Sequence, residues 1–228
     1  MKEKKEQREQ KTSSKTDKEL YWVLGVMVAA IAVFLVGFTL LKESDSFNYN
    51  GLDFQKEMLG NIPLYKHTYL TERVTRTTGQ VVRTGDASSV AILLRNDPRR
   101  LEDIPVEGKI EFLSVEQTIY ISVNSAPELS CDYSPIAMHE LSSFFTQNGF
   151  AAKAGISNET MAEENKIDYI TCENRPDRMV ISFASGDSPS IVRNGNCYIL
   201  TVANCDILAP TEKFIIQSII DAKEDISS

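Results

Sequence analysis

The chain has 228 residues, 42% of them hydrophobic, and a formal net charge of −8 at pH 7. This length suits one ordinary globular core, or one core with a small subdomain. The first twenty residues contribute seven bases and five acids, so the acidic excess lies in the rest of the chain. Because nucleic-acid binding needs a basic face that neutralises phosphates, we expect no nucleic-acid partner.

Residues 1–20 are polar, with no aromatic side chain and no aliphatic one between Met1 and Leu20. A segment of this composition cannot bury enough surface to offset its ordering entropy. We expect a disordered cytoplasmic tail.

Residues 21–41 are a run of 21 uncharged residues in which Thr39 is the only polar member. As a helix this run extends roughly 30 Å, the thickness of the hydrocarbon core of a bilayer. The apolar region of a cleaved signal is shorter, and a core helix shows a polar stripe with a period of 3.6 residues. The run therefore predicts a single transmembrane signal-anchor helix, with the lipid bilayer as its partner.

The distribution of Lys and Arg predicts the orientation of this helix. Seven bases precede the run, and only Lys42 and Lys56 lie in the fifteen or so residues after it. Positive residues are retained preferentially on the cytoplasmic side. We therefore expect a single-pass protein of the cell membrane with a cytoplasmic N-terminus and its C-terminal domain outside.

Residues 42–61 are expected to form a juxtamembrane linker. The apolar residues of this segment suggest that it docks onto the outer domain or forms a first short strand, with Asn50-Gly51 as a turn. Residues 62–228 are predicted to form an extracytoplasmic α+β domain with a mixed sheet. Its first half is rich in strand-forming residues, and the strands are expected at 65–71, 80–83, 88–95, 109–113 and 118–123. Between the third and fourth of these, Asp97 is expected to cap a helical turn that has Pro98 at its first position.

A β-α-β unit is predicted over residues 118–156. Ser134 is the expected N-cap of a helix that ends at Gly149, and residues 150–156 are the expected second strand. Such crossovers normally join parallel strands.

The last part of the chain is predicted to contain helices and strands in alternation. Asn158 is expected to cap a short helix through Glu164. Strands are expected at 169–172 and 179–183, followed by a hairpin over 190–202 with a type I′ turn at Asn194-Gly195. A C-terminal helix is expected to open at Thr211 and to fray from Lys223 onward.

All four cysteines lie on the predicted outer side of the membrane, where two disulfides are the default. The four residues are Cys131, Cys172, Cys197 and Cys205. Three connectivities are open, and we favour Cys197 with Cys205 and Cys131 with Cys172. A four-cysteine zinc site and a redox-active pair are the alternatives, but both usually use closer cysteine spacings.

The known motifs of cofactor and metal chemistry are absent. The chain has no phosphate-binding loop, dinucleotide fingerprint, nucleophile elbow or HExxH sequence. We expect no cofactor and no metal. The most enzyme-like grouping is Cys131, Asp132, His139 and Glu140, in which Cys131 is a weak candidate nucleophile and His139 its base. Asn158-Glu159-Thr160 matches the N-glycosylation acceptor pattern, so Asn158 is a candidate for modification as well as a cap.

Four stretches of the outer domain are similar to uncharacterised single-pass membrane-anchored proteins of archaea. They are residues 47–52, 95–99, 196–198 and 204–206. The resemblance implies an anchored extracytoplasmic domain and no known activity.

The leading hypothesis is a non-catalytic binding or assembly module of the cell envelope, with an envelope protein or ligand as its partner. The alternatives are an anchored hydrolase or thiol enzyme that uses Cys131 and His139, and a subunit of a larger membrane complex.

Overall fold

The computed structural model describes residues 20–34, 45–77, 80–123 and 131–227. The chain divides into two units, residues 1–45 and the compact unit 46–228. In the first unit residues 20–34 are helical, while the predicted tail, apart from Leu20, and residues 35–41 of the predicted span lie outside the described residues. None of the helices in the described parts of the chain is both long and apolar enough to cross a membrane.

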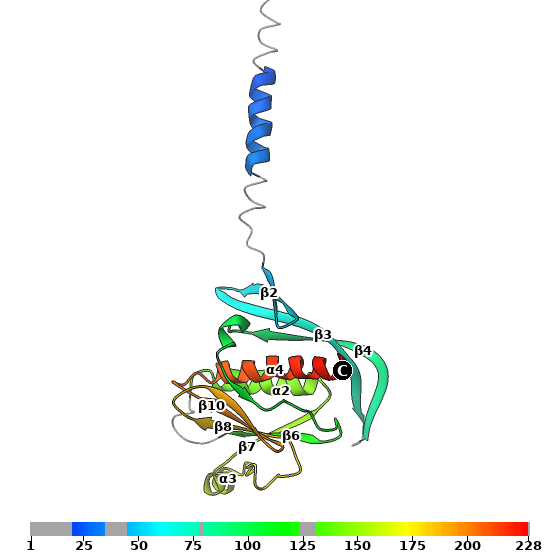
Figure 1. Cartoon of the computed structure of the whole chain (residues 1–228), viewed down its shortest axis with the longest axis vertical. Coiled ribbons are helices and arrows are strands. Elements are labelled where there is room, and N and C mark those ends of the chain that lie inside the picture. The colour runs from blue at the N-terminus through cyan, green and yellow to red at the C-terminus, as the bar shows by residue number, and fades with distance from the viewer. Residues whose placement is uncertain (1–19, 35–44, 78–79, 124–130, 228) are drawn as a thin grey trace, which may run out of the picture. The chain divides into compact units, whose positions relative to one another are not determined.

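The compact unit has the predicted α+β architecture, built from two sheets rather than one. The first is a four-stranded antiparallel sheet in the order β1-β2-β3-β4 (Figure 1). Its strands are β1 (Ser46–Tyr49), β2 (Leu52–Leu59), β3 (Ile62–Thr77) and β4 (Gln80–Leu94). The compact unit therefore starts before the boundary at residue 62 that the sequence predicted. The segment expected as a linker contains β1 and β2 because its apolar residues Tyr49, Leu52 and Phe54 are buried in the core.

The turn between β1 and β2 has the predicted form. Tyr49 pairs with Leu52, which leaves Asn50 and Gly51 as the two loop residues. Both have positive φ, 48° and 77°, as a type I′ turn requires. The two residues that specify this turn are adjacent in the sequence, and the folded chain forms the turn at these residues.

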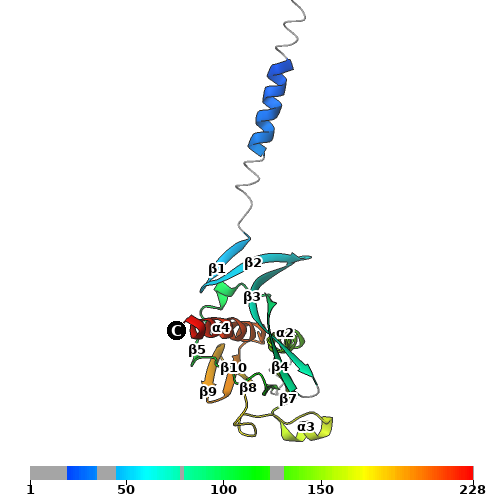
Figure 2. The same cartoon turned by 90° about the vertical axis from the view of Figure 1, so that its right-hand side faces the viewer.

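The β3–β4 hairpin is longer than the sequence indicated. The two short strands expected at 80–83 and 88–95 are one strand, β4, whose middle holds Gly85 with φ of 73°. The pairing of β3 with β4 shifts register between Glu72 and Val74. We call residues 69–77 and 80–89 of this hairpin the arm, which extends past the helices (Figure 2).

The second sheet has six strands in the order β5-β9-β10-β8-β6-β7. Its strands are β5 (Val106–Glu107), β6 (Thr118–Val123), β7 (Ala151–Ile156), β8 (Val180–Ser185), β9 (Ser190–Asn194) and β10 (Cys197–Val202). Strands β10, β8, β6 and β7 are parallel, and β9 is antiparallel to β10. The predicted β-α-β unit is confirmed, because β6 and β7 are parallel neighbours joined through α2 (Ser134–Gln147).

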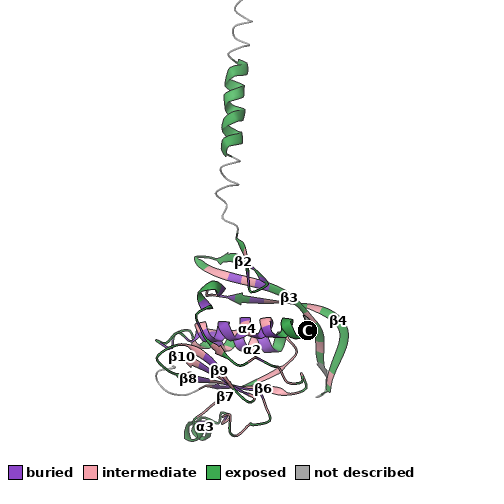
Figure 3. Cartoon of the chain, viewed as in Figure 1, coloured by how far each residue is buried: buried purple, intermediate pink, exposed green. Residues whose placement is uncertain are grey.

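Helices α2 and α4 (Leu208–Ser227) lie between the two sheets (Figures 1 and 2). Phe145 of α2 and Phe214 of α4 are fully buried in one core with residues of both sheets. Most of α4 from Pro210 to Asp221 is buried on every side (Figure 3). A helix covered on all faces is typical of the centre of a fold.

Several helix ends and one turn differ from prediction. Ser134 is the first residue of α2 and Tyr133 its N-cap, while α4 begins at Leu208, three residues before Thr211. In the β9–β10 hairpin Cys197 pairs with Asn194, so Gly195 and Asn196 are the loop residues. Only Gly195 has positive φ, which fits a type II′ rather than a type I′ turn. The caps at Asp97, before η1 (Pro98–Leu101), and at Asn158, before α3 (Glu159–Asn165), are confirmed.

Two segments expected as strands do not form a strand ladder. In 109–113, the Ile110 N–H donates to the buried Asp221 carboxylate at 2.7 Å, and the Glu111 N–H donates to the Tyr198 hydroxyl at 2.9 Å. These side chains replace the partners that a neighbouring strand would supply. In 169–172, the backbone makes only an isolated bridge to the end of β7, and the Ser122 hydroxyl donates to the carbonyl of Ile170 at 2.5 Å.

Candidate functional site

All four cysteines form disulfides, but the pairing differs from the one favoured by sequence. Cys131 is bonded to Cys205 and Cys172 to Cys197, with Cα–Cα distances of 5.4 and 5.6 Å. Cys197 opens β10, whereas Cys205 lies beyond its other end, so an extended strand separates them. Cys131 and Cys205 meet because they precede α2 and α4, which pack against each other.

The disulfides remove the thiol from the candidate catalytic grouping. The sulfur of Cys131 is bonded, and no cysteine is free. His139 is exposed on α2. The same pairing takes the cysteines out of a zinc site, and the described residues contain no group of three His, Cys, Asp or Glu that could hold a metal ion.

Asn158 acts as a helix cap. Its side-chain oxygen accepts a hydrogen bond from the Met161 N–H at 3.0 Å, and the residue is exposed. Glycosylation at this residue stays a prediction.

A groove lies between the arm, the ends of α2 and α4, and the segments at Asp53 and Phe112. Its volume is about 740 Å³. Apolar side chains make most of its wall: Leu52, Leu70, Val74, Phe112, Val115, Phe144, Phe150, Ile219 and Ala222. Grooves of this size with apolar walls and a few polar groups are typical of ligand sites.

A hydrogen bond joins the arm to the end of α2 inside the groove. The Asn148 side-chain amide donates to the Tyr69 hydroxyl at 2.7 Å. Burial raises the pKa of Tyr69 above its ordinary value, and the bond from Asn148 opposes this shift. Tyr69 therefore stays a neutral phenol at physiological pH and can donate its own proton to a ligand acceptor.

Gly149 fixes the approach of the arm to α2. It follows the helix with φ of 83°, and a Cβ there would lie 2.6 Å from Cβ of Val74. Glycine is thus required both by the left-handed backbone and by the neighbouring strand. Gly149 therefore follows the end of the helix, as predicted, and also leaves room for Val74 of the arm.

His67 lies in the floor of the groove among aromatic rings. It is 8% exposed, and its Nδ1 lies 2.8 Å from the backbone carbonyl of Asp53. Nδ1 therefore carries a proton and donates to this carbonyl. The His67 ring stacks on Tyr69 with centroids 5.9 Å apart. These contacts hold the polar side chains of the floor in one orientation.

Charged residues mark the rim of the groove. Arg83 and Glu72 form an ion pair at 3.2 Å across the arm. Lys223 of α4 donates to the carbonyl of Gly51 at 2.8 Å. The rim thus combines both signs of charge around an apolar wall.

A second feature is a pair of carboxyl groups, from the half-buried Glu140 of α2 and the buried Glu212 of α4. Glu212 is fully buried and accepts hydrogen bonds from the Arg95 and Asn96 N–H groups at 2.5 and 3.0 Å. Burial raises its pKa to about 7, and these bonds oppose the shift. Glu140 has its pKa raised to about 8, first by burial and then by the charge of Glu212, while Arg95 lowers it. Its Oε2 is buried without a hydrogen-bond partner among the described residues.

Sequence reasoning did not find the groove. Tyr69 and Asn148 are 79 residues apart, and neither belongs to a motif. In the sequence Glu140 stands out only as the neighbour of His139. The groove and the Glu140–Glu212 pair depend on the packing of distant elements. Comparison with models of protein families, with curated proteins and with solved structures finds no match for this chain.

Proposed function

We propose that this protein is a membrane-anchored extracytoplasmic module that binds a ligand of the cell envelope without catalysing a reaction. The observation that carries the proposal is the groove of about 740 Å³ between the arm and the helices. It has an apolar wall and a small set of polar groups fixed by their own hydrogen bonds, which is the usual composition of a binding site.

The walls favour a mainly apolar ligand that carries a hydrogen-bonding group. Leu70, Phe112 and Phe150 line the groove and would contact the apolar part. Tyr69 and Asn148 are already bonded to each other, so they are oriented before the ligand arrives. Preorganised polar groups lose little side-chain entropy on binding.

Anchoring and orientation are supported by the sequence. The uncharged run 21–41 has the length of a spanning helix, and the bases lie mainly before it. Two disulfides are typical of an oxidising compartment.

The groove is tested by purifying the full chain gently from its native host and analysing the bound small molecules by mass spectrometry. Ala222→Phe would fill the groove from the exposed end of α4, and Ala87→Phe adds the same ring to an exposed position of β4 that does not line it. We expect a ligand with the wild type and Ala87→Phe and none with Ala222→Phe. No ligand in the wild type, or equal amounts in all three proteins, would contradict the proposal.

The anchor is tested separately on intact host cells. We expect the full chain to remain in carbonate-washed membranes and its outer domain to be cut by protease added outside the cells. A variant lacking residues 1–41 tests whether this segment holds the protein. Full retention of that variant in the membranes, or protection of the domain from protease, would contradict the anchored arrangement.

A further inference from the structure

The end of the β2–β3 hairpin carries exposed apolar side chains on both sides of its two-residue turn, Gly60-Asn61. Met58, Leu59 and Ile62 are 60, 65 and 42% exposed. No charged residue occurs from Met58 to Tyr65. We call residues 58–63 the tip. Contiguous exposed apolar residues of this kind mark an interaction surface.

The apolar side chains of the tip lie on both faces of the sheet, with Met58 on one face and Leu59 and Ile62 on the other. The second face also carries Leu64 and Leu93, beside the ion pair of Glu57 with Lys66. Leu59 pairs with Ile62, so the two side chains lie on the same face. Leu64 follows Ile62 on that face because side chains alternate along a strand. Leu93 pairs with Lys66, which places it on the same face, and it is 46% exposed.

The tip lies at the end of the compact unit where the chain enters. Ser46 opens β1 and pairs with Gln55 of the antiparallel β2. From Gln55 the strand continues four residues to Leu59, so the tip extends roughly 13 Å beyond the entry point. Helix α3 lies at the opposite end of the compact unit (Figures 1 and 2).

A short segment connects this end to the predicted membrane span. The uncharged run ends at Leu41, and Ser46 follows five residues later. Five residues reach at most roughly 18 Å. If the anchor of the proposed function is correct, β1 begins within that distance of the hydrocarbon core, close to the lipid headgroups.

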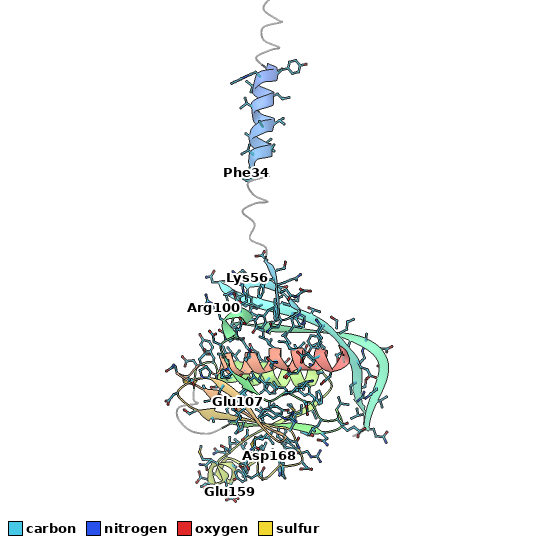
Figure 4. All side chains as sticks on the ribbon, viewed as in Figure 1. Phe34, Lys56, Arg100, Glu107, Glu159 and Asp168 are labelled. Atoms are coloured by element: carbon cyan, nitrogen blue, oxygen red, sulfur yellow. A yellow bond between two sulfur atoms is a disulfide. The ribbon has the colours of Figure 1, made fainter. Side chains whose placement is uncertain are left out.

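The charges near the tip also suit a lipid surface. Residues 55–66 contain two bases and one acid, and that acid, Glu57, is paired with Lys66 at 3.0 Å. Lys56 is exposed at this end, whereas Glu159 and Asp168 lie at the opposite end (Figure 4). A lysine at the membrane surface is attracted to anionic lipid, while acidic groups are not.

We infer that the tip docks onto the bilayer that holds the anchor. Met58, Leu59 and Ile62 insert at the level of the headgroups and upper acyl chains, and Lys56 lies near the lipid phosphates. The anchor and the tip together give the compact unit two attachments to the membrane. Two attachments restrict the rotation of the compact unit, and with it the direction in which the groove opens, more than one attachment does.

The test uses the full chain in vesicles of phosphatidylcholine and phosphatidylglycerol whose acyl chains carry bromine near the headgroups. Bromine quenches tryptophan only on close contact. Trp22 is the one tryptophan of the chain and reports insertion of the anchor in the wild type. In a Trp22→Phe background, Leu59→Trp reports on the tip. Ile167→Trp, at a position 47% exposed after α3, is the matched control.

We expect quenching of Trp22 and of Leu59→Trp, with loss of most of the emission relative to unbrominated vesicles, and none for Ile167→Trp. Quenched Trp22 with unquenched Leu59→Trp would overturn the inference while leaving the anchor intact. Blue-shifted but unquenched emission from Leu59→Trp would mean that a protein, such as a second copy, covers the tip. Unquenched Trp22 would overturn the anchor and with it the inference. Quenching of Ile167→Trp would show that the opposite end of the compact unit also contacts lipid, and this would overturn docking through the tip.

Discussion

The inner strands of the six-stranded sheet bury most of their side chains, whereas β4 of the four-stranded sheet is exposed over most of its length until Val90. The six-stranded sheet is joined largely through parallel strands that are distant in sequence, and a disulfide ties the start of β10 to the loop at Cys172. The four-stranded sheet is made only of consecutive hairpins.

This difference indicates that one part of the compact unit stabilises the fold and another part makes the interactions. The six-stranded sheet and the two helices hold most of the buried core, so changes there should lower the free energy of unfolding. The arm and the tip bury little and present apolar side chains to solvent, so changes there should alter binding and leave folding nearly unchanged.

The largest effect on stability is expected from the disulfides of the core. Cys131–Cys205 closes 74 residues and Cys172–Cys197 closes 25. In the chain-entropy account, replacing the first pair by alanine costs about 4.5 kcal/mol and replacing the second about 3.5 kcal/mol. Chemical denaturation of the two double variants measures both values.

The oxidation of all four cysteines is checked by intact mass after alkylation under denaturing conditions. No label before reduction and four labels after it are expected. Any label without reduction would contradict the two disulfides, and a larger cost for the Cys172–Cys197 pair would contradict the order of their effects.

Disruption of the contact between the arm and α2 is expected to have the next largest effect on the free energy of unfolding. Gly149→Ala adds a methyl group against Val74 at a positive φ, and we expect a loss of about 2–3 kcal/mol. Gly85→Ala is the matched control. Gly85 has φ of 73°, and a methyl group added there would meet nothing within 4 Å in the described part of the chain, so only the backbone cost of about 1 kcal/mol applies. Adding Val74→Ala to Gly149→Ala should recover part of the loss, and equal losses for the two glycine variants would contradict the contact.

The Glu140–Glu212 pair predicts a pH dependence of stability. The pKa of Glu140 is about 8 in the folded chain and 4.5 is its ordinary value, so between these values the folded state holds the extra proton. The free energy of unfolding therefore falls as the pH rises through this window. After allowance for screening by water, Glu140→Gln should gain roughly 1–2 kcal/mol over the wild type at pH 8 and little at pH 4.

Thermal unfolding at a series of pH values measures this difference. Glu163→Gln, on the exposed side of α3, is the control and should follow the wild type. A Glu140→Gln variant that follows the wild type at every pH would contradict the assignment.

The smallest effect on stability is expected in the arm. Leu70 is 74% exposed and lines the groove. Leu70→Ser should change the free energy of unfolding by less than about 0.5 kcal/mol. The amount of ligand that co-purifies should nevertheless fall, since an apolar wall residue is lost. A large loss of stability, or unchanged ligand, would remove the distinction between the arm and the core.

Features encoded by neighbouring residues could be predicted from the sequence. Asn50-Gly51 forms its two-residue turn, Asp97 and Asn158 cap their helices, and the unit 118–156 has parallel strands. Each depends on backbone preferences or on a short hydrophobic pattern.

The rest depends on partners that are distant in the chain. The segment at Ile110 has strand-like composition, but Asp221 and Tyr198 supply hydrogen bonds to it and its neighbour Glu111. Cysteine spacing does not reveal that α2 and α4 pack together and bring Cys131 to Cys205. The groove is likewise made by elements that meet only in the folded chain.

Photo-crosslinking in native membranes tests whether the groove beside the arm is the binding site. The full chain carries a photoreactive benzoylphenylalanine either at position 70, in the groove wall, or at position 167, after α3. We predict one defined adduct from position 70 that disappears with Ala222→Phe, and none from position 167. No adduct from position 70, or the same adducts from both positions, would contradict binding in the groove.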